Sequence, residues 1–185
     1  MSTIVIGDGP GGLSAALFLA KNNTPVIVFG TDDTAMHHAY LYNYLGIAEI
    51  SGSDFQRIAR GQVEAVGGEL RSDHIASVSQ TEDGFAVTTE DGQTTTATYL
   101  ILTEGRSPDL AMSLGVAAGE DGITTDADGR TSIKGLYVVG RSARPKRSQA
   151  IISAGQGAAA AVDILSLLAG KDVQDWDTPP KDDTE

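Results

Sequence analysis

The chain has 185 residues, of which 41% are hydrophobic, so it is long enough to bury a core as one domain. It contains no cysteine, which excludes disulfides, thiolate metal sites and a redox-active Cys-x-x-Cys pair within these residues. Its formal net charge of −12 disfavours nucleic acid and membranes as partners, and such an acidic surface predicts a halophilic source.

The first thirty residues have the pattern of a βαβ unit. The apolar runs 3–6 and 26–29 predict buried strands, and apolar residues between them recur at helical spacing. The turn between strand and helix carries G-x-G-x-x-G, formed by Gly7, Gly9 and Gly12. These glycines allow a tight turn, a close approach of a pyrophosphate and close helix packing. The unit therefore predicts dinucleotide binding, with a glycine-rich turn of purely steric origin as the alternative.

One expected residue is missing from this unit. A carboxylate about twenty residues beyond the glycines normally binds a ribose hydroxyl. The second strand is followed instead by Gly30 and Thr31. Either Asp32 takes over this hydrogen bond, or the bond is absent.

The next segment holds two adjacent histidines and three tyrosines. No further ligands at metal spacing accompany the histidines, so no metal site is expected. The alternation of Tyr40, Tyr42 and Tyr44 predicts partly buried packing residues, with an aromatic wall beside a planar ligand as the alternative. Ser53 is expected to cap a helix that ends at Gly67-Gly68, before a short strand.

Residues 73–102 predict a β-meander, whose strand-like runs are separated by Asp-Gly turns: 75–78, 85–88 and 98–102. The last of these runs is continuously apolar and suits a parallel sheet. Residues 103–122 form a connection with one short helical piece over 110–114. The acidic stretch 126–129 lacks the later acidic ligand of a calcium loop, so a plain turn is expected.

No carboxylate occurs from Gly129 to Val162, yet six of the thirteen bases lie there: Arg130, Lys134, Arg141, Arg144, Lys146 and Arg147. A bound polyanion would explain this inversion of charge. A basic surface loop, or a docking patch for an acidic partner, is the alternative. Within this window, run 136–139 predicts another buried strand.

Residues 148–169 predict a helix rich in Ala, Gly and Ile. Gly155 and Gly157 within it each cost about 1 kcal/mol relative to Ala. That cost makes sense where the helix passes very close to a sheet or a ligand.

Taken together, these motifs resemble the FAD-binding half of the thioredoxin reductase family, within the pyridine nucleotide-disulfide oxidoreductase superfamily. The motifs that carry the resemblance are Ile6–Gly12, Tyr42–Gly46, Ile50–Gly52, Thr131–Gly140, Gln149-Ala150 and Ser153–Gly157. The resemblance implies an α/β fold, a Rossmann-like FAD-binding domain with a central parallel sheet and an inserted β-meander. This domain would cover residues 1–170, and residues 171–185 would form an acidic flexible tail.

The resemblance implies FAD as the cofactor. The glycine turn would hold the FAD pyrophosphate, Asn43 would lie near the ribityl–flavin region, and Gly140 with Arg141 would meet the ribityl chain or a phosphate. Gln149 and Ala150 would sit beside the isoalloxazine ring. The candidate cofactor-binding residues are Gly7, Gly9, Pro10, Gly11, Gly12, Thr31, Asn43, Ala76, Gly140, Arg141, Gln149 and Ala150. No catalytic or metal-binding residue is predicted.

The chain departs from the family pattern in three places. The family has a carboxylate where Gly30 stands and an Asp where Arg141 stands. An NAD(P)H-binding domain interrupts the family's FAD domain, whereas here residues 103–109 are expected to join the two halves directly. Without that domain and a cysteine pair, the usual route of thioredoxin reduction is closed to these residues.

The predicted function is that of an FAD-binding oxidoreductase that exchanges electrons at the flavin with an external donor or acceptor. This partner would be a small molecule or an acidic carrier protein. The alternative is a non-catalytic nucleotide-binding module, for FAD or NADP, or a regulatory subunit. No signal peptide is expected, because the first apolar run is short and leads directly into the glycine motif. No membrane span is expected either, since Asp163 interrupts the best candidate, so the prediction is a cytoplasmic protein. The resemblance suggests a homodimer.

Overall fold

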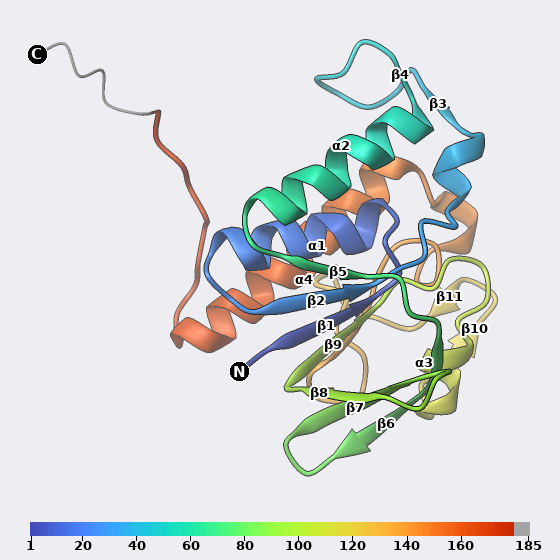
Figure 1. The fold of residues 1–185 in the computed structure, drawn as a ribbon, viewed down its shortest axis with the longest axis vertical. Coiled ribbons are helices and arrows are strands. Elements are labelled where there is room, and N and C mark those ends of the chain that lie inside the picture. The colour runs from blue at the N-terminus through green and yellow to red at the C-terminus, as the bar shows by residue number, and fades with distance from the viewer. Residues whose placement is uncertain (180–185) are drawn as a thin grey trace, which may run out of the picture.

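The computed structural model describes residues 1–179, which are built around a five-stranded sheet (Figure 1). The strand order is β12-β9-β1-β2-β5, and every neighbouring pair is parallel. The strands are β1 (Thr3–Ile6), β2 (Val26–Phe29), β5 (Glu69–Arg71), β9 (Tyr99–Leu102) and β12 (Leu136–Val138). The predicted α/β fold with a central parallel sheet is confirmed.

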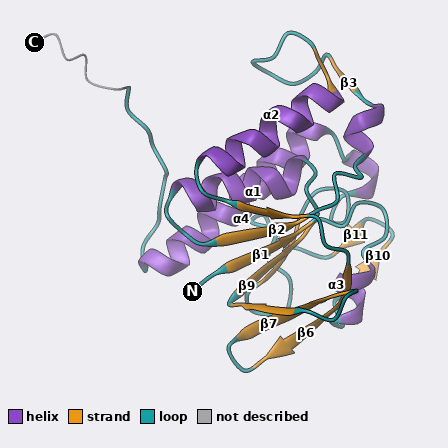
Figure 2. Cartoon of the chain, viewed as in Figure 1, coloured by secondary structure: helices purple, strands orange, loops and turns teal. Residues whose placement is uncertain are grey.

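Both faces of this sheet are covered, as Figures 1 and 2 show. Three helices lie on one face: α1 (Pro10–Lys21), α2 (Gly52–Ala65) and α4 (Ala150–Ala169). A three-stranded antiparallel sheet lies on the other: β6 (Ile75–Thr81), β7 (Gly84–Thr89) and β8 (Thr94–Ala97). Side chains alternate along the strands, so that Val5 belongs to the helix-side core and Ile4 to the opposite core. This double burial explains why the strands are continuously apolar.

The remaining elements are short. They are the helices η1 (Ala35–His38), α3 (Asp109–Ser113) and η2 (Pro145–Arg147), and the paired strands β3 (Tyr40–Leu41) with β4 (Ile50–Ser51) and β10 (Ala118–Gly119) with β11 (Gly122–Ile123). The helical piece expected in the connection after β9 is therefore present as α3.

Helix α4 crosses α1 at close range. A Cβ built on Gly157 would lie less than 3.0 Å from the carbonyl oxygen of Gly11, a distance that real Cβ atoms do not show. Gly157 therefore lies at a close approach, as predicted. The neighbouring element is helix α1 rather than the sheet. At Gly155 a Cβ would meet no protein atom within 4 Å, so the sheet does not approach closely there, and a close approach of a ligand stays a prediction.

Three local predictions need correction. The cap of α2 is Ser51 and not Ser53: its Oγ accepts the Asp54 N–H at 3.1 Å, and the helix begins two residues earlier than a Ser53 cap implies. The meander also contains β8, which was not predicted because three of its four residues are threonines and not apolar residues. Tyr40 and Tyr42 are exposed by 51% and 72%, because the segment forms a small hairpin at the surface rather than a packed strand. Only Tyr44 of the three is partly buried, as predicted.

The expectation that no segment could span a membrane was too strict. By length and composition alone, α4 is long and apolar enough, with a mean hydropathy of 1.6. Its apolar residues are accounted for within the fold, since Ala160, Ala161 and Ile164 are fully buried in the core beside α1.

The chain after α4 runs along the end of α1. Lys21 Nζ lies 3.0 Å from Asp175 Oδ1 and 2.6 Å from Asp177 Oδ2. The rest of the predicted tail, residues 180–185, lies outside the described residues. The flexibility of the tail stays a prediction.

Candidate functional site

The carboxyl ends of the parallel strands open onto one cleft of about 440 Å³. Gly7 after β1, Gly30 after β2 and Thr103 after β9 all line it. The chain passes from β1 to β2 on one side, whereas β9 lies on the other side of β1. The cleft therefore lies at the point where the strand order reverses, which is where open α/β sheets bind ligands. Its volume is in the usual range for cofactor sites.

The glycine turn forms the floor of this cleft. Gly7 has a φ of +102°, and a Cβ there or on Gly12 would come within 3.0 Å of another backbone carbonyl oxygen. These two glycines are therefore required by the turn itself. Gly9 differs, because it has an ordinary φ of −71° and a Cβ there would meet no protein atom closer than Thr34 Oγ1 at 3.7 Å.

Helix α1 begins at this turn without a side-chain cap: Gly9 is its N-cap, and Pro10 occupies its first turn. The N–H groups of Gly11 and Gly12 are among those that have no partner within a helix at this end. A helix start with free N–H groups and a positive dipole end attracts phosphate. The open space beside Gly9 and these donors fit a pyrophosphate, which is the part of FAD predicted here.

Seven of the predicted cofactor-binding residues line the cleft: Gly7, Gly9, Pro10, Gly11, Thr31, Arg141 and Ala150. Gly12 is buried in the turn below, and the N–H of Gly140 donates to Gln156 Oε1 at 3.0 Å. Asn43 and Gln149, both predicted near the flavin, do not line the cleft but meet each other, with Nδ2 of Asn43 3.2 Å from Oε1 of Gln149. Ala76 is exposed on β6 and outside the lining, although Ile75 beside it lines the cleft.

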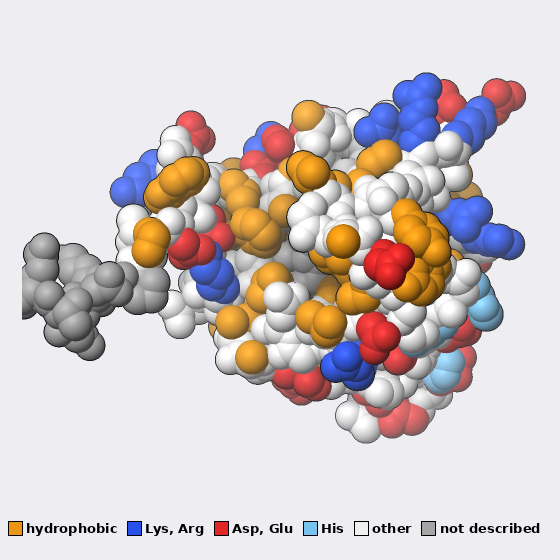
Figure 3. All heavy atoms as spheres, turned by 90° about the horizontal axis from the view of Figure 1, so that it is seen from above, with side chains coloured by type: hydrophobic (Ala, Val, Ile, Leu, Met, Phe, Trp, Pro, Cys, Tyr) orange, Lys and Arg blue, Asp and Glu red, His pale blue; other side chains and the backbone are white. Residues whose placement is uncertain are grey.

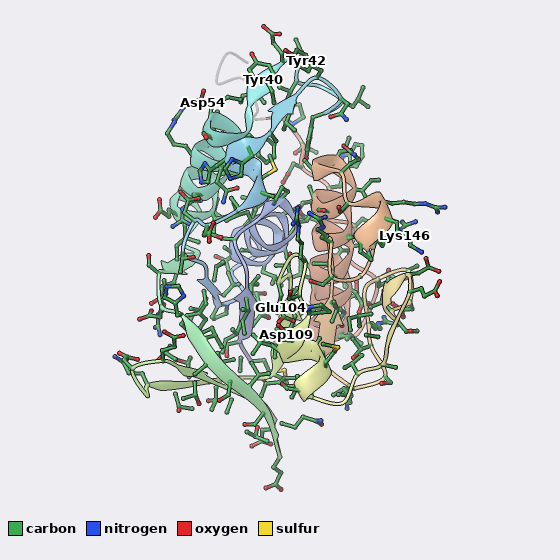
Figure 4. The ribbon with its side chains drawn as sticks, turned by 90° about the vertical axis from the view of Figure 1, so that its right-hand side faces the viewer. Tyr40, Tyr42, Asp54, Glu104, Asp109 and Lys146 are labelled. Atoms are coloured by element: carbon green, nitrogen blue, oxygen red, sulfur yellow. The ribbon has the colours of Figure 1, made fainter. Side chains whose placement is uncertain are left out.

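The tyrosine-rich segment lies away from this cleft. Tyr40 and Tyr42 have ring centroids 4.8 Å apart and project from the far end of the molecule (Figure 4). Tyr44 packs on Phe55 and lines a separate apolar groove of about 220 Å³ beside α1. None of the three lines the main cleft, so the aromatic wall does not form there.

Four acids line the cleft: Asp8, Asp33, Asp73 and Glu104. Two of them, Glu104 and Asp8, have partners in the fold that the sequence interpretation did not anticipate. Glu104 follows β9, and its carboxylate accepts the N–H groups of Leu110 at 2.8 Å and Ala111 at 3.1 Å, so that it caps α3 (Figure 4). Burial raises the pKa of Glu104 above its usual value, although the two N–H donors offset part of this rise. Its position two residues after the end of the buried strand β9 was the signal that could have identified it.

The second acid is Asp8, inside the glycine turn. Its Oδ2 accepts the backbone N–H of Asp32 at 3.0 Å and forms an ion pair with Arg60 of α2. Asp32 was one of two alternatives for the missing ribose contact, the other being its absence. Asp32 is outside the cleft lining, and its own carboxylate lies 3.3 Å from Nε2 of His37. An acid between two glycines of this motif, together with a glycine at residue 30, was the available signal.

The basic window is less open than its composition indicates. Arg130 pairs with the buried Asp163, and Lys146 Nζ lies 3.2 Å from Asp121. Arg141 is the one Arg or Lys among the cleft residues of the described chain. Arg144 and Arg147 are exposed on the loop that follows it. Several Lys and Arg side chains lie close together at the right-hand end of the face drawn in Figure 3.

Comparison with known families places the chain. The family described as "Pyridine nucleotide-disulphide oxidoreductase" matches residues 43–158, more than half of the chain. The chain belongs to this family. Members of the family are FAD-binding flavoproteins, which confirms FAD as the expected cofactor at the level of the family.

Individual relatives point the same way. The chain is 37% identical over 108 residues to a bifunctional thioredoxin reductase/thioredoxin of Mycobacterium leprae, and 35% identical over 109 residues to a thioredoxin reductase of Streptomyces clavuligerus. Each match covers 56% of this chain, but only 24% and 34% of the relatives. The chain thus spans about a quarter to a third of the length of these curated relatives.

Solved structures of the same kind share the fold. The atypical thioredoxin reductase TRi from Desulfovibrio vulgaris Hildenborough aligns with a TM-score of 0.83 at 20% identity, over 91% of this chain and 98% of that chain. A ferredoxin-flavin thioredoxin reductase from Clostridium acetobutylicum aligns with a TM-score of 0.80 at 19% identity, over 91% of this chain and 97% of that chain. At these identities the likeness establishes the fold.

Proposed function

We propose that this chain is an FAD-dependent oxidoreductase that binds the dinucleotide in the cleft at the carboxyl edge of its parallel sheet. The observation that carries the proposal is the open space beside Gly9. Its missing side chain leaves a space that the protein's own packing does not need. A glycine costs backbone entropy, and that cost is understandable here if a phosphate approaches the backbone closely.

The lining residues suggest an order along the bound cofactor. The adenosine end would lie at Gly30 and Thr31, the pyrophosphate at the start of α1, and the flavin end toward Arg141 and Ala150. The hydrogen bond between Asn43 and Gln149 would hold the loops beside the flavin end together. FAD would supply the electron-carrying ring, and these residues would bind and orient it.

We further propose that residues 1–170 form one FAD-binding domain with no second dinucleotide domain inserted in it. The chain runs from β9 through residues 103–108 directly to α3. Because the chain has no cysteine, no dithiol within these residues can relay electrons, so donor and acceptor would be external. The exposed bases Arg144 and Arg147, with Arg141 at the cleft, suit an acidic carrier protein by charge. A small molecule as donor and a homodimer are also consistent with the family resemblance.

We also propose that the protein works in the cytoplasm and in concentrated salt, and its acidic composition supports the second of these proposals. With 25 acids against 13 bases, self-repulsion destabilises the compact state until salt screens it. The free energy of unfolding is then expected to rise steeply from dilute to concentrated KCl. A flat or falling dependence would contradict the halophilic assignment.

A non-catalytic module for FAD or NADP is the second candidate, favoured by Arg141 where the family has Asp. NADP is the poorer ligand of the two. The carboxylate of Asp8 lies beside Gly30, where it would repel a 2′-phosphate, and Arg60 is already paired with it.

The test is spectroscopic and starts from protein purified in concentrated KCl. The proposal predicts a yellow protein that releases about one FAD per chain. It also predicts that the bound flavin is bleached anaerobically by one of NADH, NADPH or reduced ferredoxin and recovers with an acceptor. Bound FAD that no donor reduces would support the non-catalytic module. A folded, colourless chain that takes up no added FAD would contradict both FAD proposals.

A further inference from the structure

A carboxylate from the glycine turn fills the space at the end of β2. A Cβ built on Gly30 would lie less than 3.0 Å from Cβ and Cγ of Asp8. Real Cβ atoms essentially never approach so closely, so residue 30 must remain glycine while Asp8 keeps this position. The missing carboxylate at residue 30 and the added one at residue 8 are therefore a single feature of the structure.

The Asp8 side chain is held from two sides. Its Oδ2 accepts the N–H of Asp32 at 3.0 Å and pairs with the guanidinium of Arg60 on α2. Its backbone carbonyl accepts a hydrogen bond from Nε2 of Gln56, a fully buried side chain of the same helix, at 2.5 Å. With its own side chain only 5% exposed, Asp8 has one orientation before any ligand arrives.

The other carboxylate oxygen is directed differently. Among residues 1–179, no other residue donates a hydrogen bond to Oδ1 of Asp8, whereas Oδ2 receives both donors. Oδ1 is 2.7 Å from the place where a side chain at residue 30 would begin. Asp8, Gly30 and Thr31 all line the cleft. An acceptor oxygen thus stands where a side chain from the end of β2 would otherwise enter the site.

The charge on Asp8 is only partly offset. Burial raises the pKa of its carboxyl group above the usual value, and the nearby Arg60 charge lowers it by less. A buried carboxylate in this condition gains from a further hydrogen-bond donor.

We propose that Asp8 is the ribose-binding carboxylate of this chain, accepting a hydrogen bond from a hydroxyl of the adenosine ribose, and that Gly30 is the residue that makes room for it. Arg60 is a positioning residue that keeps the Asp8 carboxylate ionised and oriented. The ligand class is a dinucleotide with a free ribose diol. This inference rests on the proposed function for the identity of the dinucleotide, but its residues can be tested separately.

The test measures the dissociation constants of FAD and of ADP for the cofactor-free wild type and for variants. Asp8→Ala is expected to weaken both by about tenfold to a hundredfold, the effect of losing a hydrogen bond to a charged group. Asp54→Ala removes the same charge from the exposed face of α2 and is expected to leave both constants unchanged. Thermal unfolding of each variant checks that it is folded.

Relocating the carboxylate separates the ribose contact from general damage. Gly30→Glu alone is expected to abolish binding, because its side chain collides with Asp8. The double variant Asp8→Gly/Gly30→Glu is expected to recover at least tenfold of the affinity lost in Asp8→Gly. A folded Asp8→Ala variant that binds FAD and ADP as tightly as the wild type would overturn the inference, and so would a double variant no better than Asp8→Gly.

The ADP titration keeps the two proposals distinguishable. Binding of ADP that depends on Asp8, in a wild type that takes up no FAD, would retain the ribose contact and reject the flavin function. Binding of FAD that does not depend on Asp8 would retain the proposed FAD binding and reject the ribose contact. A folded wild type that binds neither ligand would overturn both.

Discussion

Two carboxylates of this chain are almost fully buried beside an arginine, but only one of them lies at the cleft. Asp163 on α4 accepts the Tyr137 hydroxyl at 2.6 Å and Nε of Arg130 at 2.6 Å. Asp8 has Arg60 and one backbone N–H, and no side-chain hydroxyl. Each carboxylate has two partner residues, one of them an arginine, but Asp163 receives three hydrogen bonds and Asp8 receives two.

The pKa values of the two carboxyl groups show what this difference means. Burial acts to raise the pKa of both, but the hydrogen bonds from Arg130 and Tyr137 outweigh it at Asp163, where the pKa is lowered. At Asp8 burial outweighs the charge of Arg60, and the pKa is raised. The satisfied carboxylate stabilises the fold, and the partly satisfied one retains a capacity to bind a ligand. Perturbed carboxyl groups in clefts are typical of functional sites.

The largest expected effect comes from removing the satisfied carboxylate. Asp163→Ala leaves the buried Tyr137 hydroxyl without an acceptor and should lower the free energy of unfolding by about 2–4 kcal/mol. The cost stays below that of a fully buried pair because the Arg130 side chain is 45% exposed and can be hydrated. Denaturant titration measures it. The dissociation constant of FAD for the folded variant should equal that of the wild type. A tenfold change would contradict the claim that Asp163 stabilises the fold without contributing to ligand binding.

The second prediction concerns pH. The lowered pKa of Asp163 means that its contribution to stability is present above the ordinary value of 3.8 and is lost as the pH falls below it. The raised pKa of Asp8 has the opposite sign: the ionised group opposes folding, and this penalty disappears as the pH falls from above toward 3.8.

Free energies of unfolding of the cofactor-free wild type, Asp8→Asn and Asp163→Asn should therefore be compared over about pH 3 to 6. Relative to its Asn variant, the Asp163 site should gain stability with rising pH in the lower part of this range. The Asp8 site should lose stability with rising pH in the upper part. Slopes of the same sign at both sites would contradict the comparison.

A smaller effect is expected from Arg60→Met, which leaves Asp8 in place without its counter-charge. The pKa of Asp8 should rise further, since the positive charge that lowered it is gone. As the pH is lowered, the affinity for FAD should then begin to fall at a higher pH than in the wild type. Arg60→Lys retains the positive charge and should give a pH profile closer to that of the wild type. A pH profile of the dissociation constant identical to that of the wild type would assign Arg60 a purely structural role.

The smallest effect is expected from Tyr137→Phe. Asp163 keeps Arg130, so the variant loses one hydrogen bond and should be destabilised by about 1 kcal/mol, or roughly 2–4 °C in Tm. Differential scanning calorimetry is sufficient to measure it. An unchanged Tm would mean that Arg130 alone satisfies Asp163.

The elements of this fold could be predicted from sequence because local patterns determine them. The run before Gly7 and the run before Gly140 are apolar on both faces, as buried parallel strands must be, and both are strands of the central sheet. β8 was missed because its threonines carry no apolar alternation, and its place depends on pairing with β7. Ser51 was missed because the helix begins with Gly52, where a Cβ would collide with the Met36 carbonyl oxygen, a neighbour distant in sequence.

In the site, too, the features determined by local sequence could be predicted and those that depend on distant contacts could not. The glycine turn could be predicted because a turn of this geometry requires glycine at fixed spacing. The role of Asp8 could not, because it depends on the space above Gly30 and on Arg60, which is 52 residues further along the chain. Sequence showed a gap at residue 30, and the three-dimensional arrangement shows what occupies it.

The most direct test of the account is equilibrium dialysis of the folded, cofactor-free chain against FAD in concentrated KCl. From the glycine turn, the cleft and Asp8 we expect saturable binding of one FAD per chain, with ADP competing for the same site. A folded chain that retains no FAD above the level of the dialysis buffer would contradict the account.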